Sequence, residues 1–141
     1  MKHRYVLALC ALFLSGCASK VVKESDAKYA SADRIFAYQT KHPDDAFVTV
    51  VRDWSMTGAG CYASITVDGN LAAKLGTSEK VDLYFPAGEK VVGVALEGGG
   101  LCALNPARQE RYVETKPNQH KVLRAYTSNS GDLDILPTTV Q

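Results

Sequence analysis

Residues 62–70 constrain the fold more than any other stretch of the chain. The segment 62–67, with the sequence YASITV, alternates with a period of two, so small or aliphatic side chains occupy one face of a strand and tyrosine or hydroxyl side chains the other. Asp68 and Gly69 follow directly, and an Asp-Gly pair suits the two central positions of a type I′ turn, which need a positive φ. The stretch therefore predicts a β-hairpin whose second strand covers residues 71–75.

Short segments of the same kind recur along the chain at intervals of roughly ten residues. They are rich in β-branched or aromatic residues, and turn residues such as those at 42–45 and 86–89 separate them. No long segment has the period of an α-helix. The pattern predicts an all-β domain with one modest core, a small antiparallel β-sandwich. The other expected strands are residues 34–39, 47–52, 81–85, 90–96, 110–114, 121–126 and 133–136.

The start of the chain has the organisation of a bacterial secretory signal. A basic stretch at 2–4 precedes the apolar run 5–13, which is too short to cross roughly 30 Å of hydrocarbon. The following Leu14-Ser15-Gly16-Cys17 resembles the lipobox of bacterial lipoproteins. This resemblance implies cleavage before Cys17 and acylation of that residue. The alternative is an ordinary secreted protein with a cysteine near its cleavage site.

The resemblance implies three parts, a signal peptide over 1–16, a lipidated tether over 17–32 and a β-sandwich domain over 33–141. Residues 18–32 are small, polar and charged, as is typical of a flexible connection. Ala18 and Ser19 stand where enteric lipoproteins of the inner membrane carry an aspartate. The implied location, for a Gram-negative host, is therefore the periplasmic side of the outer membrane.

The charge balance argues against nucleic acid as a partner. The full chain has a formal charge of +1, and removal of residues 1–16 takes away the two basic residues Lys2 and Arg4, which leaves −1. Such a balance produces no electrostatic attraction to a polyanion. The expected contact with a membrane is therefore the N-terminal lipid, because several acyl chains together anchor a protein stably.

Two cysteines remain for the folded domain. Cys10 leaves with the signal and Cys17 is acylated, so that Cys61 and Cys102 are left. Two remaining cysteines in an exported domain favour one structural disulfide. A metal or redox pair is the alternative, but the chain has no Cys-x-x-Cys spacing.

Residues 65–70 and 83–92, with the sequences ITVDGN and LYFPAGEKVV, resemble the two turns of PEGA-type surface-layer modules and of a related uncharacterised domain of bacterial lipoproteins. Ala87 and Lys90 depart from the usual residues of the second turn. The resemblance covers roughly residues 33–96. It implies a sandwich of immunoglobulin-like or transthyretin-like character and carries no known activity, and a shared fold does not transfer function.

No catalytic residue, metal site or cofactor is predicted. The chain has none of the usual hydrolase, metalloprotease or nucleotide-binding motifs. The acidic pairs 44–45 and 132–134 resemble paired carboxylates or a weak calcium site, but turn chemistry explains them better. His42 and His120 lie in polar, turn-like sequence. The glycines 98–100 precede no helix, so a hairpin loop is favoured there over a phosphate site.

A partner-binding surface is the better candidate. Trp54 and Met56 lie in a loop ahead of Cys61, and residue types of this kind are enriched at interface centres. Arg108 and Arg111 follow Cys102, so a disulfide would bring both segments into one surface. The alternatives are that Trp54 covers the open end of the sandwich and that residues 105–111 form a solvated loop. We therefore expect a non-catalytic cell-envelope lipoprotein, a binding or scaffold module with an envelope protein as partner. The alternatives are an inhibitor of a hydrolase such as lysozyme and an accessory lipoprotein of a secretion or conjugation machine.

Overall fold

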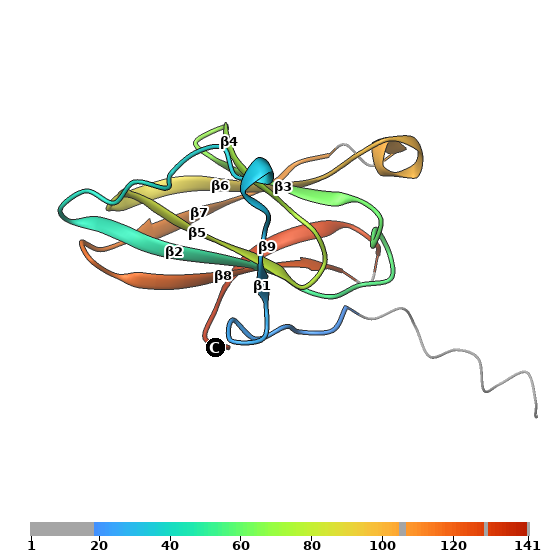
Figure 1. Cartoon of the computed structure of the whole chain (residues 1–141), viewed down its shortest axis with the longest axis horizontal. Coiled ribbons are helices and arrows are strands. Elements are labelled where there is room, and N and C mark those ends of the chain that lie inside the picture. The colour runs from blue at the N-terminus through green and yellow to red at the C-terminus, as the bar shows by residue number, and fades with distance from the viewer. Residues whose placement is uncertain (1–18, 105–106, 129, 141) are drawn as a thin grey trace, which may run out of the picture.

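A computed structural model describes residues 19–104, 107–128 and 130–140. Two β-sheets lie face to face, and Figure 1 shows the four-stranded sheet above the five-stranded one. The predicted all-β sandwich is confirmed. The elements are β1 (Lys28–Tyr29), η2 (Ala32–Arg34), β2 (Asp45–Arg52), β3 (Tyr62–Val67), β4 (Asn70–Leu75), β5 (Glu79–Pro86), β6 (Gly88–Glu97), η3 (Gly100–Leu104), β7 (Gln109–Thr115), β8 (His120–Thr127) and β9 (Leu133–Thr138).

The two sheets have the strand orders β1-β5-β2-β8-β9 and β4-β3-β6-β7. The pairs β2–β8 and β1–β5 are parallel, whereas the other pairs are antiparallel. These two parallel pairs depart from the predicted antiparallel arrangement. Parallel neighbours need a long connection between them, and here the second sheet supplies it between β2 and β8.

The β3–β4 hairpin forms as the sequence predicts. Asp68 has a φ of 48° and Gly69 a φ of 81°, the two positive values that a type I′ turn requires. The register shifts between Ile65 and Thr66, which marks a bulge. The alternation in β3 places Ile65 and its two neighbours on that face in the core.

The core lies between the sheets, where the inward side chains of both layers interdigitate. Alternate residues of β2, β3 and β5 belong to this core, as the period of two predicts, although β2 and β3 are buried on their other face as well. The large aliphatic and aromatic core residues are Val48, Val50, Ile65, Val67, Leu75, Val81, Leu83, Phe85, Val92, Val94, Val113, Leu123, Leu133 and Ile135.

Residues 34–39, predicted as a strand, form an irregular strap across one open side of the sandwich. The N–H of Phe36 donates to Ala72 in β4 over 2.8 Å, and the N–H of Tyr84 in β5 donates to Tyr38 over 2.8 Å. Tyr38 has a φ of 63°, which lies outside the β region. The prediction is wrong because the backbone of this strap divides its hydrogen bonds between the two sheets and pairs with neither as a regular strand. The strap thereby covers the edges of both sheets.

Residues 22–27 pack against the outer face of the five-stranded sheet and β1 joins the edge of that sheet, so the predicted tether over 17–32 is wrong for this stretch. Ala27 joins Val51 and Val122 in a small apolar cluster, and Val22 packs against it. The N–H groups of Lys28 and Ala30 also bond to carbonyls of the chain around β5. Small apolar residues spaced through a polar sequence thus find a surface that the sequence alone does not reveal. Cys17 lies outside the described residues.

An ion pair ties η2 to the start of β5. Arg34 donates to both carboxylate oxygens of Glu79, over 2.5 and 2.8 Å. The same carboxylate accepts the N–H of Gly76 over 2.6 Å. The Arg34 hydrogen bond is the main reason that the pKa of Glu79 lies below its ordinary value. The pair is half-buried, so it stabilises the fold more than an exposed pair would.

Glu79→Gln is expected to lower the free energy of unfolding at pH 7 by about 1–3 kcal/mol, because a charged and bidentate contact is lost. A lowered carboxyl pKa contributes stability above the ordinary pKa and loses it as the pH falls through the lowered value. The wild type should therefore lose stability in acid more steeply than the variant. Urea unfolding at pH 7 and at about pH 3 measures both effects. Glu89→Gln, at an exposed position, is the control. Equal acid dependence of the wild type and E79Q would contradict the expectation.

Candidate functional site

A disulfide joins the two loops at one end of the sandwich. Cys61 and Cys102 are bonded with their Cα atoms 5.5 Å apart, so the predicted pairing is confirmed. The predicted hairpin loop around 98–104 contains the 3-10 helix η3. Gly98 has a φ of 148°, and a Cβ there would lie 3.0 Å from the Cβ of Cys102, so the close approach requires glycine. We call loop 54–60 and loop 98–104 together the disulfide end.

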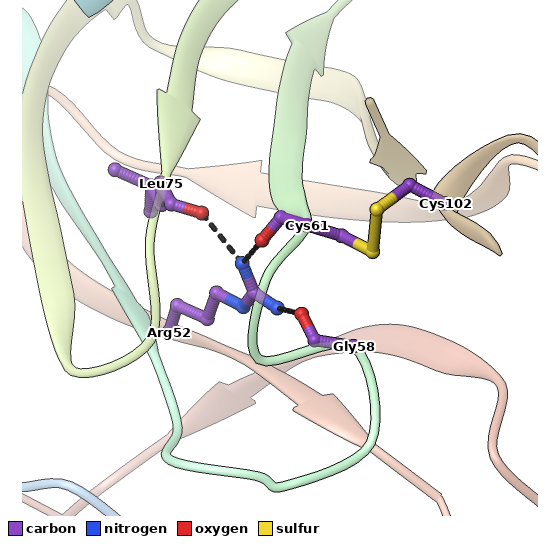
Figure 2. Close-up of a disulfide and its surroundings, with 5 residues drawn as sticks. All are labelled: Arg52, Gly58, Cys61, Leu75 and Cys102. Atoms are coloured by element: carbon purple, nitrogen blue, oxygen red, sulfur yellow. Dashed lines mark hydrogen bonds between the residues drawn. A yellow bond between two sulfur atoms is a disulfide. The ribbon is translucent and has the colours of Figure 1, made fainter. Parts of the chain in front are cut away.

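A buried arginine organises the first of these loops, as Figure 2 shows. Arg52 closes β2 and points inward, with 1% of its surface exposed. Its Nη1 donates to the carbonyls of Cys61 and Leu75 over 2.6 and 2.7 Å. Its Nη2 donates to the carbonyl of Gly58 over 2.9 Å. One guanidinium therefore holds loop 54–60, the start of β3 and the end of β4 together.

Arg52 keeps its charge at neutral pH although it is buried. Burial lowers its pKa to about 10, and the nearby Glu79 carboxylate acts in the opposite direction. The carbonyl oxygens replace the water that a charged guanidinium loses on burial. The sequence offers no sign of this role, because an arginine at the end of an apolar strand is ordinarily exposed.

Asp53, the next residue, attaches the N-terminal segment. Its side chain is buried, its Oδ1 accepts the N–H of Val22 over 3.0 Å, and its Oδ2 lies 2.6 Å from Nε of Arg124. Burial raises the pKa of the Asp53 carboxyl, while the Val22 N–H and Arg124 act in the opposite direction. Lys20 and Trp54 then exchange backbone hydrogen bonds of 2.8 and 3.1 Å. The first described residues are therefore fixed to the disulfide end.

Large apolar side chains of the disulfide end face solvent. Trp54, Met56, Leu101 and Leu104 are all exposed. A cleft of about 460 Å³ lies beside Trp54, against the N-terminal segment. The residues that line this cleft are Lys20, Val21, Val22, Asp26, Trp54 and Ser78.

The four residues predicted to form one partner-binding surface divide into two groups. Trp54 and Met56 lie in loop 54–60, as expected. Arg111 instead forms a 2.7 Å ion pair with Asp134, which links β7 to β9 across the second open side of the sandwich. Arg108 lies over Gly93 of β6 and 3.6 Å from Glu110. Among the described residues, no hydrogen bond or ion pair joins the two groups.

A threonine, a histidine and an aspartate meet on the outer face of the five-stranded sheet. The Thr49 hydroxyl donates to Asp82 over 2.8 Å and lies 3.1 Å from Nε2 of His120. Because the one hydroxyl proton is given to Asp82, Nε2 of His120 must be the donor to Thr49. His120 therefore does not accept the proton of Thr49, whereas the Asp82 carboxylate does accept this hydrogen bond. Thr49 is fully buried, so its hydroxyl is out of reach of a substrate in this arrangement.

The same cluster holds the N-terminal segment in place. Tyr29 donates to Asp82 over 2.9 Å, and this hydrogen bond is the main reason that the pKa of Tyr29 is raised. The ring of His120 stacks on that of Phe47 with the ring centroids 4.3 Å apart, and its Nε2 lies 3.6 Å from Oε1 of Glu24. The cluster therefore connects residues 24–29 to the sheet.

The acidic pairs have separate partners. Asp45 accepts the N–H of His42 over 2.9 Å within the turn, and Asp44 accepts from Asn118. Asp134 pairs with Arg111, whereas Asp132 accepts from Ser130. In the part of the chain that the structure describes, no group of three or more potential ligands gathers to hold a metal ion.

Comparison of the chain with protein-family models, with curated proteins and with solved structures finds no match. The resemblance of residues 65–70 and 83–92 to PEGA-type modules therefore remains a prediction. No helix within the described ranges is long and apolar enough to cross a membrane.

Proposed function

We propose that the protein is a non-catalytic lipoprotein of the cell envelope, held on a membrane by acylated Cys17 and acting there as a binding or scaffold domain. The observation that carries the proposal is Leu14-Ser15-Gly16-Cys17, directly after a basic start and an apolar run. Small residues ahead of a cysteine are what a lipoprotein signal peptidase accepts. The disulfide is in keeping with an oxidising compartment such as the periplasm.

The packing of residues 19–30 is compatible with cleavage ahead of Cys17. This segment bonds to Asp53, Trp54, Ser78 and Lys80, all of which stay in the chain after cleavage. Removal of residues 1–16 therefore leaves these contacts in place. Ala18 and Ser19 after the cysteine favour the outer membrane of a Gram-negative host, with the domain on the periplasmic side.

A binding or scaffold role is favoured by how the described polar clusters are used. Thr49 and His120 belong to the cluster that holds residues 24–29, and the Thr49 hydroxyl is fully buried, out of reach of a substrate. Arg52 and Asp53 serve the attachment of loops in the same way. The hydrogen bonds of these side chains join segments of the chain and make the domain rigid, as a scaffold requires.

The anchor is tested by Cys17→Ser in cells grown with a clickable palmitate analogue. We expect the wild type to take up the label and to sediment with the outer membrane. The variant should be unlabelled and should accumulate as an uncleaved or soluble form, because serine offers no thiol for diacylglyceryl transfer. Cys10→Ser, in the apolar run, is the matched control and should behave as the wild type. A labelled C17S variant in the outer membrane would refute the proposal.

A further inference from the structure

We propose that the disulfide end lies on the surface of the lipid bilayer, with Trp54, Met56, Leu101 and Leu104 at the level of the headgroups. The inference rests on the proposed function, because acylated Cys17 brings the domain to the membrane. It adds an orientation and a contact surface to that anchor.

The chain between the acylated residue and the folded domain is short. Lys20 is fixed to Trp54 by two backbone hydrogen bonds, and two residues separate it from Cys17. Three residue steps span at most about 10 Å. The acylated residue therefore lies within that distance of Lys20, and no long tether remains to lift the domain away. The sandwich must approach the bilayer at the end where Lys20 is attached.

The chemistry of that end carries the second step. Loops 54–60 and 98–104 contain no charged residue, although 22% of the whole chain is charged. Four large apolar side chains of these loops are exposed, namely Trp54 (42%), Met56 (68%), Leu101 (84%) and Leu104 (76%). Tryptophan favours the interface between lipid and water, where its ring is in apolar and its N–H in polar surroundings. A bilayer surface suits this combination better than bulk water does.

The shape and the rigidity of the end carry the third step. η3, in orange at the right of Figure 1, projects beyond the two sheets and carries Leu101 and Leu104. The disulfide and the three carbonyl bonds of Arg52 hold both loops in place before any contact is made. Docking on lipid therefore costs little conformational entropy. Lys20, at the same end, is exposed and can reach phosphate groups.

Trp54 is the only tryptophan of the chain, so its fluorescence reports this contact without a label. The experiment uses the full lipidated protein in vesicles of phosphatidylethanolamine and phosphatidylglycerol, with and without acyl-chain-brominated lipid. We expect brominated lipid to quench the fluorescence of Trp54 at least twofold. Leu101→Asp/Leu104→Asp should reduce the quenching while acylation stays intact, because both side chains are exposed.

Trp54→Phe/Tyr112→Trp is the matched control. Tyr112 is 75% exposed and pairs with Val91 of β6. Val91 lies six residues before Glu97, where β6 reaches the disulfide end, so Tyr112 is about 20 Å along the strand from that end. A tryptophan at 112 should be quenched little. Mass spectrometry establishes acylation of each sample. An acylated protein whose Trp54 is quenched no more than Trp at 112 would overturn the inference alone, whereas a protein without acyl chains would overturn the proposed function.

Discussion

Arg52→Met is expected to lower the free energy of unfolding by about 3–5 kcal/mol. Methionine fills much of the same volume but donates no hydrogen bond, so the carbonyls of Gly58, Cys61 and Leu75 lose their guanidinium partner. Each buried carbonyl left without a donor costs about 1–3 kcal/mol, and such losses do not add fully at one site. Since domains are stable by about 5–15 kcal/mol, the variant loses a large share of its stability.

Urea unfolding of the purified domain, followed by the fluorescence of Trp54, measures the effect of R52M. Arg108→Met is the matched control, because Arg108 is exposed and its ion pair with Glu110 is long at 3.6 Å. That control should change the free energy of unfolding by less than about 1 kcal/mol. Equal effects of the two substitutions would contradict the role given to Arg52.

Replacement of both Cys61 and Cys102 by serine is expected to lower the free energy of unfolding by about 4 kcal/mol. The two residues are 41 positions apart, and the disulfide removes the entropy of that open loop from the unfolded chain. The loss should be visible as a lower urea midpoint in the double variant. Wild-type protein kept in reductant should unfold at nearly the same midpoint as the variant.

The comparison with reduced wild-type protein separates the covalent link from the serine substitutions. A double variant that unfolds within about 1 kcal/mol of the oxidised wild type would contradict the expected contribution of the disulfide. Arg52 bonds to the carbonyl of Cys61, so the two features act on the same piece of backbone. The disulfide thus holds this end of the sandwich by a covalent bond, and the buried arginine holds it by hydrogen bonds.

Local chemistry predicted much of the fold. The alternation in 62–67 and the Asp68-Gly69 pair define the β3–β4 hairpin, with both turn residues at positive φ. The segments predicted at 47–52, 81–85, 90–96, 110–114, 121–126 and 133–136 all lie within observed strands, which extend one or two residues further. These features depend on residues close in sequence, so their pattern is readable without the fold.

Such a pattern does not predict the conformation of segments that depend on partners far away in the sequence. Residues 34–39 resemble a strand by composition, but β4 and β5 draw their hydrogen bonds in two directions. Residues 19–32 resemble a flexible tether, but the outer face of the five-stranded sheet offers Val51 and Val122 as an apolar surface. In both cases the deciding contact is with a surface that exists only after the sheets have formed.

By itself, the sequence determined the β class, the hairpin at Asp68 and the pair of cysteines available for a disulfide. Only the tertiary structure decided the parallel pairing of β2 with β8 and the burial of Arg52 among three carbonyls. Turn geometry and side-chain alternation are local and act within a few residues. Strand partners and the solvation of a buried charge depend on groups far apart in sequence, and folding alone brings these together.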